Sequence, residues 1–403
     1  MTNRLIHGDC LNTPLPPDHF DTLITDPPYG LGFMGKDWDA GVPGKVFWKK
    51  FLDACKPGAV AFVFGGTRTF HRLTCAIEDA GWEIRDCMMW LYGSGFPKSL
   101  DISKAIDKAK GAERESLGKD PNRAGRLVNQ MEHSNPTGTW QAGKRCVDIT
   151  NPATDLAKLW DGWGTALKPA WEPIIVAMKP LDGTFAHNAE KWGIGGLWID
   201  GGRIETNEVL SAEYGQPSGS GCYNWNKEKK KVERTGKTNT QGRWPANIIL
   251  DEEAGAILDE QSGRNGSNKT VRLTRKRKGF MLSGSENNVQ EANSPDQYGD
   301  SGGASRFFYC AKAGKKERND GLNNHPTVKP LALMEYLCRL SRPPQGGIVL
   351  DPFAGSGTTA LACANTDRQY VVVEKEREYC EITAARLGGI PIEVNIPQRP
   401  RLL

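Results

Sequence analysis

The sequence lacks the features that mark membrane, secreted and zinc-binding proteins. No apolar run in its 403 residues approaches the length of a membrane span, and residues 1–9 contain no apolar signal core. Its ten cysteines are scattered, with no Cys-x-x-Cys pair. We therefore expect no membrane association, no bound metal and no disulfide framework, and we expect the reducing cytoplasm as the location.

A strong charge imbalance is also missing. The formal net charge is only +4, and hydrophobic residues make up 38% of the chain. A chain of this length and composition can hold one large domain or two ordinary ones. Because the net charge is small, only the distribution of charge along the chain can indicate a nucleic-acid partner.

The most distinctive turn, residues 351–359, lacks two known phosphate-binding patterns. It follows a short apolar run that predicts a buried strand, and a predicted helix begins at Ala360. A strand, a glycine-containing turn and a helix in this order bring backbone N–H groups close to a ligand. A Walker loop needs lysine where Thr358 stands, and a dinucleotide fingerprint needs a third glycine at Ala360. The pattern favours a nucleoside without a pyrophosphate, with an ordinary turn as the alternative.

The rest of the chain alternates strand and helix patterns, which predicts a doubly wound, mostly parallel α/β sheet. A second predicted strand, residues 370–374, ends in Glu374, and an acid there suits a ribose diol. The other expected elements are strands at 4–6, 20–24, 59–64, 82–92 and 171–178, and helices at 46–55, 69–80, 99–110, 153–160 and 331–339.

Polar residues follow two of these strands. Asp9 comes after residues 4–6, and the tetrapeptide Asp26-Pro-Pro-Tyr29 comes after residues 20–24. Ligands in open α/β sheets bind at the carboxyl ends of strands, so both acids are well placed for a site. The alternative is a cap or turn acid at Asp9 and a plain β-turn at the tetrapeptide.

Three motifs together resemble those of the DNA amino-methyltransferases. They are the tetrapeptide at 26–29, the hexapeptide His-Pro-Thr-Val-Lys-Pro at 325–330 and the turn at 351–359. Enzymes of this family move a methyl group from S-adenosyl-L-methionine to an exocyclic nitrogen of a DNA base. The order of the motifs is similar to the circularly permuted beta class. The resemblance implies a Rossmann-like methyltransferase fold with an inserted target-recognition region.

The resemblance also implies catalytic roles for Asp26, Pro27, Pro28 and Tyr29. Asp26 and the carbonyl of Pro27 would each accept a hydrogen bond from the target amine, and the prolines would fix these acceptors in place. Tyr29 would offer a flat face to a base rotated out of the duplex. An aspartate at the head of the tetrapeptide is mostly found with adenine-N6 activity, and cytosine-N4 is the runner-up.

The implied cofactor site combines both ends of the chain. Asp9 would face the adenine of S-adenosyl-L-methionine, Phe353 would pack on its adenine or ribose, and Glu374 would bind the ribose hydroxyls. The hexapeptide would lie against the methionine end. The full set of implied cofactor-binding residues is Asp9, His325, Thr327, Lys329, Asp351, Phe353, Ala354, Gly355, Ser356, Gly357, Thr358 and Glu374.

Residues 206–304 differ in composition from the rest of the chain, and we expect them to contact the DNA. They are rich in Gly, Ser, Asn and Lys, and residues 264–278 hold seven basic residues and no acid. Between two halves of a methyltransferase, such a run would neutralise phosphates of double-stranded DNA, whereas a solvated linker is the alternative. The predicted DNA-binding residues are Arg272, Arg275, Lys276, Arg277 and Lys278.

The predicted domain organisation alternates core and inserted segments. A homodimer is one option for the oligomeric state. Rival functions are methylation of RNA or of a protein amide, and DNA binding without catalysis. The segments are a catalytic half at 1–92, an insertion at 93–165, late core strands at 166–205, a target-recognition insert at 206–304, a cofactor-binding half at 305–390 and a tail at 391–403.

Overall fold

The protein divides into two compact units in its computed structural model. One unit comprises Met1–Ser94 with Trp171–Leu403, and the other is Gly95–Ala170. The structure describes residues 3–31, 41–93, 95, 99–119, 148–205, 210–211, 238–239, 242–263, 265–266, 301–311 and 328–395.

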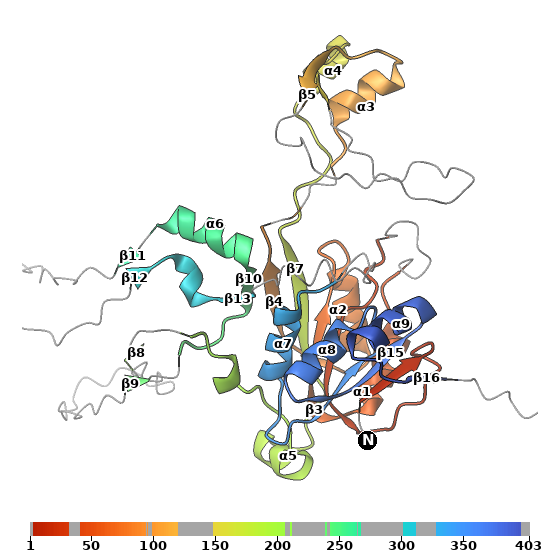
Figure 1. Ribbon diagram of the computed structural model, residues 1–403, viewed down its shortest axis with the longest axis vertical. Coiled ribbons are helices and arrows are strands. Elements are labelled where there is room, and N and C mark those ends of the chain that lie inside the picture. The colour runs from red at the N-terminus through yellow and green to blue at the C-terminus, as the bar shows by residue number, and fades with distance from the viewer. Residues whose placement is uncertain are drawn as a thin grey trace, which may run out of the picture. The chain divides into compact units, whose positions relative to one another are not determined.

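The first unit is built on a ten-stranded sheet with the order β13-β10-β4-β7-β3-β2-β14-β15-β1-β16 (Figure 1). Among these strands every neighbouring pair is parallel except the two that involve β7. The prediction of a mostly parallel α/β sheet is therefore confirmed. The strands are β1 (Arg4–His7), β2 (Phe20–Thr25), β3 (Cys55–Phe64), β4 (Glu83–Leu91), β7 (Trp171–Met178), β10 (Ile248–Asp251), β13 (Tyr309–Ala311), β14 (Ile348–Asp351), β15 (Gln369–Glu374) and β16 (Ile392–Val394).

Helices cover both faces of this sheet. Because side chains alternate along a strand, β3 sends Phe62 to one face and Val63 to the other. The Phe62 face packs under α7 (Leu331–Leu340), α8 (Thr358–Asn365) and α9 (Arg377–Arg386). The Val63 face packs under α1 (Lys45–Ala54) and α2 (Phe70–Asp79). The helices α5 (Phe185–Trp192) and α6 (Glu252–Ser262) follow β7 and β10.

The antiparallel direction of β7 matters for the site. Its first residues, Trp171 and Glu172, pair with Leu91 and Trp90 at the end of β4. The amino end of β7 therefore lies at the edge of the sheet where its parallel neighbours finish. Ligands of such sheets bind at that edge.

Three details add to or differ from the sequence-based prediction. The strand expected at 59–64 begins earlier, so Pro57 and Gly58 lie inside β3, where the register with β2 shifts and accommodates the proline. Within the predicted insert at 206–304, the patch at 244–258 has the composition of ordinary core, and it contributes β10, which pairs with β4, and most of α6. Part of the predicted tail forms the edge strand β16 beside β1.

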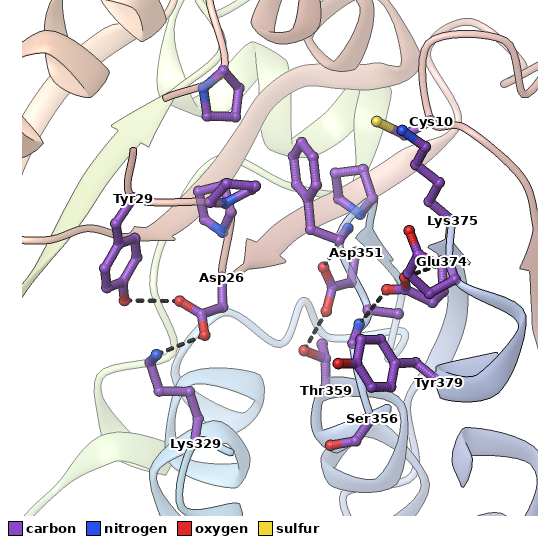
Figure 2. Close-up of a pocket in the computed structure, with 18 of the residues that line it drawn as sticks. Cys10, Asp26, Tyr29, Lys329, Asp351, Ser356, Thr359, Glu374, Lys375 and Tyr379 are labelled. Atoms are coloured by element: carbon purple, nitrogen blue, oxygen red, sulfur yellow. Dashed lines mark hydrogen bonds and ion pairs between the residues drawn. The ribbon is translucent and has the colours of Figure 1, made fainter. Parts of the chain in front are cut away.

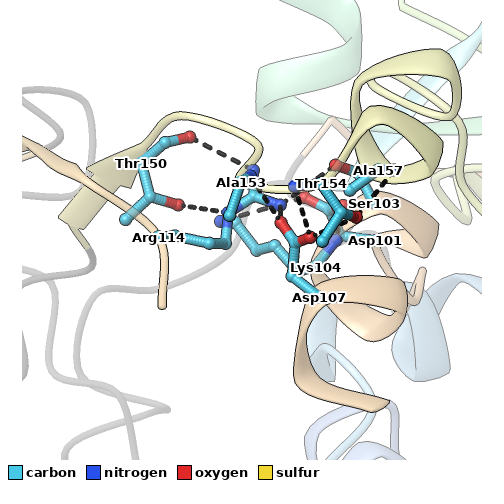
Figure 3. Close-up of polar contacts among 9 residues, drawn as sticks. All are labelled: Asp101, Ser103, Lys104, Asp107, Arg114, Thr150, Ala153, Thr154 and Ala157. Atoms are coloured by element: carbon cyan, nitrogen blue, oxygen red, sulfur yellow. Dashed lines mark hydrogen bonds and ion pairs between the residues drawn. The ribbon is translucent and has the colours of Figure 1, made fainter. Parts of the chain in front are cut away.

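The second unit is small and is organised around a buried carboxylate (Figure 3). It contains α3 (Ile102–Ala109), β5 (Ser116–Lys119), β6 (Asp148–Thr150) and α4 (Asp155–Leu159). Asp107 accepts hydrogen bonds from the Arg114 guanidinium at 2.8 Å and from the Ala153 and Thr154 amides at 2.9 and 3.1 Å. Burial alone would raise the pKa of Asp107, but these donors outweigh it and set the pKa at about 2.

Two absences hold for the part of the chain that the structure describes. No helix there is long and apolar enough to cross a membrane. Within the same residues, no group of three or more His, Cys, Asp or Glu side chains could hold a metal ion.

Candidate active site

A cavity of about 410 Å³ lies in the first unit, where β1, β2, β14 and β15 end and β7 begins (Figure 2). Most of the residues singled out from the sequence line it together, although they come from both ends of the chain. Those residues are Asp9, Asp26, Pro27, Pro28, Tyr29, Lys329, Asp351, Phe353, Ala354, Gly355, Ser356, Thr358 and Glu374.

Some predicted residues are not part of this lining. Gly357 lies in the same turn, at the start of α8, without lining the cavity. His325 and Thr327 fall outside the described residues, as do the predicted DNA contacts Arg272, Arg275, Lys276, Arg277 and Lys278.

One end of the cavity is the turn between β14 and α8. Gly357 has a φ of 77°, a left-handed conformation that favours glycine. A Cβ atom at this position would lie 2.3 Å from the Thr383 side chain of α9. Only glycine allows the turn to pack this closely under α9, and this explains the sequence pattern at this position.

Asp351 shapes the turn from inside. Its carboxylate accepts hydrogen bonds from the hydroxyls of Thr25 at 2.6 Å and Thr359 at 2.5 Å, and from the Phe353 amide at 3.1 Å. Burial raises the pKa of Asp351 to about 6, although these donors oppose the rise. With its oxygens engaged in this way, Asp351 holds β2, β14 and α8 together at the floor of the cavity.

Glu374 is held by backbone donors at the tip of β15. Its two carboxylate oxygens accept hydrogen bonds from the amides of Gly355 at 2.7 Å and Glu376 at 2.8 Å. Burial raises the pKa of Glu374 to about 7. Each carboxylate oxygen can accept a further bond, so the group can still bind hydroxyls of a ligand in the cavity.

Asp9 and Phe353 form other parts of this end. The Asp9 carboxylate accepts a hydrogen bond from the Leu11 amide at 2.8 Å, so Asp9 is a turn acid that also lines the cavity. The Phe353 ring packs against Phe47 and Phe51 of α1, with centroids 6.1 and 6.0 Å apart. These contacts fix the Phe353 ring as an apolar wall.

The opposite end of the cavity holds a polar network around Asp26 (Figure 2). The Tyr29 hydroxyl lies 2.8 Å from Asp26 Oδ1, and Lys329 Nζ donates to Asp26 Oδ2 at 2.6 Å. The Tyr29 carbonyl in turn accepts from the Thr69 hydroxyl at 2.7 Å. The turn at 26–29 is therefore anchored on both sides, by α2 and by the segment before α7.

The cation in this network is strongly buried. The Lys329 side chain is 8% exposed, and its ammonium lies 5.3 Å from the centre of the Tyr29 ring and 5.1 Å from that of Phe64. Burial lowers the pKa of Lys329, but Asp26 and Glu172 outweigh this effect, and the pKa is raised. Burial and the same two carboxylates raise the pKa of Tyr29 well above its usual value. Lys329 is therefore a cation and Tyr29 a neutral hydroxyl at neutral pH.

Glu172 was missed from the sequence. Its Oε2 lies 3.1 Å from the Tyr29 hydroxyl and 3.4 Å from Lys329 Nζ, so it belongs to the network around Asp26. The sequence does distinguish this residue, because Glu172 is the one charged residue in the apolar stretch 171–178. Thr359 and Tyr379, which also line the cavity, were not singled out either.

Comparison with known proteins shows the family of the chain. A profile of the DNA methylase family N6_N4_Mtase matches residues 20–385. The chain belongs to this family. The match includes the Asp26 network and the turn at 351–359, whereas Asp9 precedes it.

Two curated relatives match shorter stretches of this chain. The type II methyltransferase M2.MboI of Moraxella bovis is 41% identical over 77 residues, which are 19% of this chain and 27% of the relative. The type II methyltransferase M.Cfr9I of Citrobacter freundii is 35% identical over 99 residues, which are 21% of this chain and 33% of the relative. The chain therefore spans a third or less of the length of either relative.

Solved structures align along most of the chain with low identity. The M1.HpyAVI–SAM complex is 16% identical and aligns over 95% of this chain and 98% of its own, with a TM-score of 0.38. The PvuII DNA methyltransferase (cytosine-N4-specific) is 14% identical and aligns over 96% and 86%, with a TM-score of 0.43.

Proposed function

We propose that this DNA methylase transfers a methyl group from S-adenosyl-L-methionine to the N6 amino group of adenine in double-stranded DNA. The observation that carries the proposal is a single cavity with two different ends. Asp26 and Tyr29 lie at one end, and the β14–α8 turn with Glu374 lies at the other. Segments more than 300 residues apart meet there, as the Lys329–Asp26 bond illustrates.

The residues of the turn fit the cofactor chemically. S-adenosyl-L-methionine supplies a methyl group activated by its positively charged sulfur. The Glu374 carboxylate, oriented by two backbone amides, can accept bonds from ribose hydroxyls. Phe353 offers an apolar wall, and Gly355 lets the backbone approach a ligand closely.

The other end fits an amino group of a base. Asp26 can accept a hydrogen bond from the amine and receive the proton that the nitrogen releases on methylation. Such an acceptor, held in place before the reaction, orients the amine. The target nitrogen is out of reach inside a duplex, so the base must be rotated out, and the Tyr29 ring can stack on it.

The choice of adenine depends on the residue at position 26. Asp-Pro-Pro-Tyr resembles the tetrapeptides found mostly with adenine-N6 activity, which favours adenine over cytosine. Methylome sequencing of DNA from cells that express the protein reports the base, its position and the recognition sequence together. We expect N6-methyladenine at one short sequence. Finding only N4-methylcytosine would replace adenine by cytosine, and DNA without new methylation would overturn the proposal.

The basic run at 264–278 is proposed to hold the DNA backbone. Neutralising Arg275, Lys276, Arg277 and Lys278 should leave cofactor affinity unchanged, because the cavity lies on other residues. It should flatten the salt dependence of DNA binding by roughly 0.9 in slope for each phosphate that is no longer neutralised. Binding at several salt concentrations, for the wild type and the fourfold variant, measures this slope. An unchanged slope would identify the run as a solvated linker.

A further inference from the structure

Both oxygens of the acceptor proposed for the target amine already receive a donor. Asp26 Oδ1 faces the Tyr29 hydroxyl at 2.8 Å, and Asp26 Oδ2 accepts from the Lys329 ammonium at 2.6 Å. An ammonium this close weakens a carboxylate both as an acceptor for an amine and as a base for its proton. Either the reaction proceeds against this competition, or Lys329 moves away when the base arrives.

A second carboxylate lies within reach of both donors. Glu172 Oε2 is 3.4 Å from Lys329 Nζ and 3.1 Å from the Tyr29 hydroxyl. The hydroxyl has one proton, so it can donate to Asp26 or to Glu172 but not to both at once. The three protons of the ammonium allow it to contact either carboxylate or both. The network therefore has two arrangements that differ only in which carboxylate receives the donors.

The fold brings Glu172 to this position through the direction of β7. Glu172 pairs with Trp90 at the end of β4, because β7 begins where its neighbours finish. A parallel strand in this place would carry residue 172 to the opposite edge of the sheet. Only the antiparallel strand delivers a second carboxylate beside Asp26.

We propose that Glu172 is a positioning residue that draws Lys329 and the Tyr29 hydroxyl away from Asp26 when the target amino group enters. Asp26 is then free to accept the amine. The inference deepens the proposed function above and rests on it, because it assumes an amino group as the substrate.

Charge and burial explain why a second carboxylate is needed. A buried ammonium cannot leave its partner without a large desolvation penalty unless another anion receives it. Lys329 is 8% exposed, whereas Asp26 and Glu172 are 23% and 24% exposed. With Lys329 on Glu172, the negative charge of Asp26 faces the amine alone, where positive charge develops during methylation. Other ionisable groups that act on this network are Asp351 of β14 and Tyr92 after β4.

The test compares Glu172→Gln with the double variant Glu172→Gln/Lys329→Met. The substrate is a duplex carrying the sequence found by methylome sequencing, and methyl transfer is followed in a single turnover. In Glu172→Gln, Asp26 is the one carboxylate among the described residues that still pairs with Lys329, and we expect transfer about 100-fold slower. In the double variant Lys329 no longer competes for Asp26, so transfer should be faster than in Glu172→Gln. Two independent structural defects would instead make the double variant the slowest.

The single variant Lys329→Met completes the cycle, because additivity can be judged only against both single variants. A merely structural role for Glu172 would make the two substitutions additive, whereas the proposed role makes the effect of Glu172→Gln depend on Lys329.

Controls separate folding from function. Glu172→Asp keeps a carboxylate and should recover part of the rate. Glu83→Gln removes a carboxylate from the exposed far end of the same β4–β7 strand pair, where it contacts Arg85, and should leave the rate unchanged. Glu172→Gln should bind S-adenosyl-L-methionine as the wild type does, which confirms that it is folded.

Wild-type speed in Glu172→Gln, or strict additivity in the double variant, would overturn the inference. A wild type that methylates no DNA would instead overturn the proposed function.

Discussion

The end of the cavity proposed to bind the cofactor (the cofactor end) and the end proposed for catalysis (the catalytic end) use the same residue type, a carboxylate, in opposite ways. At the cofactor end, Asp351 and Glu374 accept hydrogen bonds only from neutral donors among the contacts described. Their pKa values rise with burial to about 6 and about 7. At the catalytic end, Asp26 and Glu172 share the ammonium of Lys329.

The difference shows how neutral donors and a cation each affect a carboxylate. Neutral donors orient a carboxylate without cancelling its charge, so burial dominates and the group titrates near neutrality. A cation compensates the charge and can move between two anions. We therefore infer that the cofactor end is a fixed frame for a ligand, and that the donors of the catalytic end can be rearranged.

The largest effect on this difference between the two ends is expected from a change at Asp26. Asp26→Ala removes the acceptor for the amine and leaves Lys329 with Glu172 alone. We expect methyl transfer to fall about 10³-fold or more, while cofactor affinity stays near that of the wild type because Asp26 lies at the other end. Single-turnover assays and calorimetry measure the two quantities. Asp53→Ala, which removes an exposed carboxylate of α1 that contacts Lys49, is the matched control. An active Asp26→Ala variant would contradict the proposed role.

The converse change is Glu374→Ala. It removes a carboxylate at the cofactor end and should weaken S-adenosyl-L-methionine binding by about 1–3 kcal/mol, the range for removing hydrogen bonds to a charged group. Calorimetry on the folded variant measures the affinity. Glu381→Ala, which removes an exposed carboxylate of α9 paired with Arg377, should bind normally. Unchanged affinity in Glu374→Ala would remove Glu374 from the cofactor site.

The raised pKa of Glu374 gives a third test. With a pKa of about 7, the group loses its charge below neutrality, so cofactor affinity should fall by about tenfold from pH 8 to pH 6. The free energy of unfolding should change in the opposite direction and increase as the pH falls. The folded pKa lies above the ordinary value of 4.5, so the folded state favours the protonated form. That stability is fully present below pH 4.5 and is lost as pH rises through about 7.

Both trends should weaken in Glu374→Gln, whose amide does not titrate. Calorimetry and thermal unfolding at several pH values measure them. A residual stability trend at slightly lower pH is expected in the variant, because Asp351 titrates at about 6 and its shift has the same sign. Parallel rather than opposite trends in the wild type would contradict the assignment of the shift to Glu374.

The sequence predicted the strand-end residues well and the network around Asp26 poorly, for a physical reason. Alternation of strands and helices indicates a parallel sheet, and a parallel sheet places Asp9, Asp26, Asp351 and Glu374 at one edge. The sequence contains no comparable signal for the direction of β7, because an apolar strand has the same pattern in a parallel and in an antiparallel pairing. Without that direction, Glu172 looks like an acid within a core strand. The pairing of Lys329 with Asp26 also depends on how distant segments of the chain come together in the fold.

The smallest effect is expected at the hydroxyl of Tyr29, which lies between the two carboxylates. Tyr29→Phe keeps the flat ring for stacking and removes only the proton that Asp26 and Glu172 share. One hydrogen bond contributes about 1 kcal/mol, and the hydroxyl competes with the amine for Asp26, so the rate of methyl transfer should stay within about fivefold of the wild type. Tyr29→Ala, which also removes the ring, should be slower than Tyr29→Phe because a stacked base loses about 1–3 kcal/mol.

A matched control is Tyr309→Phe, which removes a hydroxyl that donates to the Ala332 carbonyl at 3.1 Å, away from the cavity. This variant should lose some stability and keep its rate of methyl transfer. Single-turnover rates of the three variants decide the outcome. If Tyr29→Phe is as slow as Tyr29→Ala, the hydroxyl does more than complete the network, and the ring is not the main contribution of Tyr29. If Tyr29→Phe is as fast as the wild type, Lys329 alone controls access to Asp26.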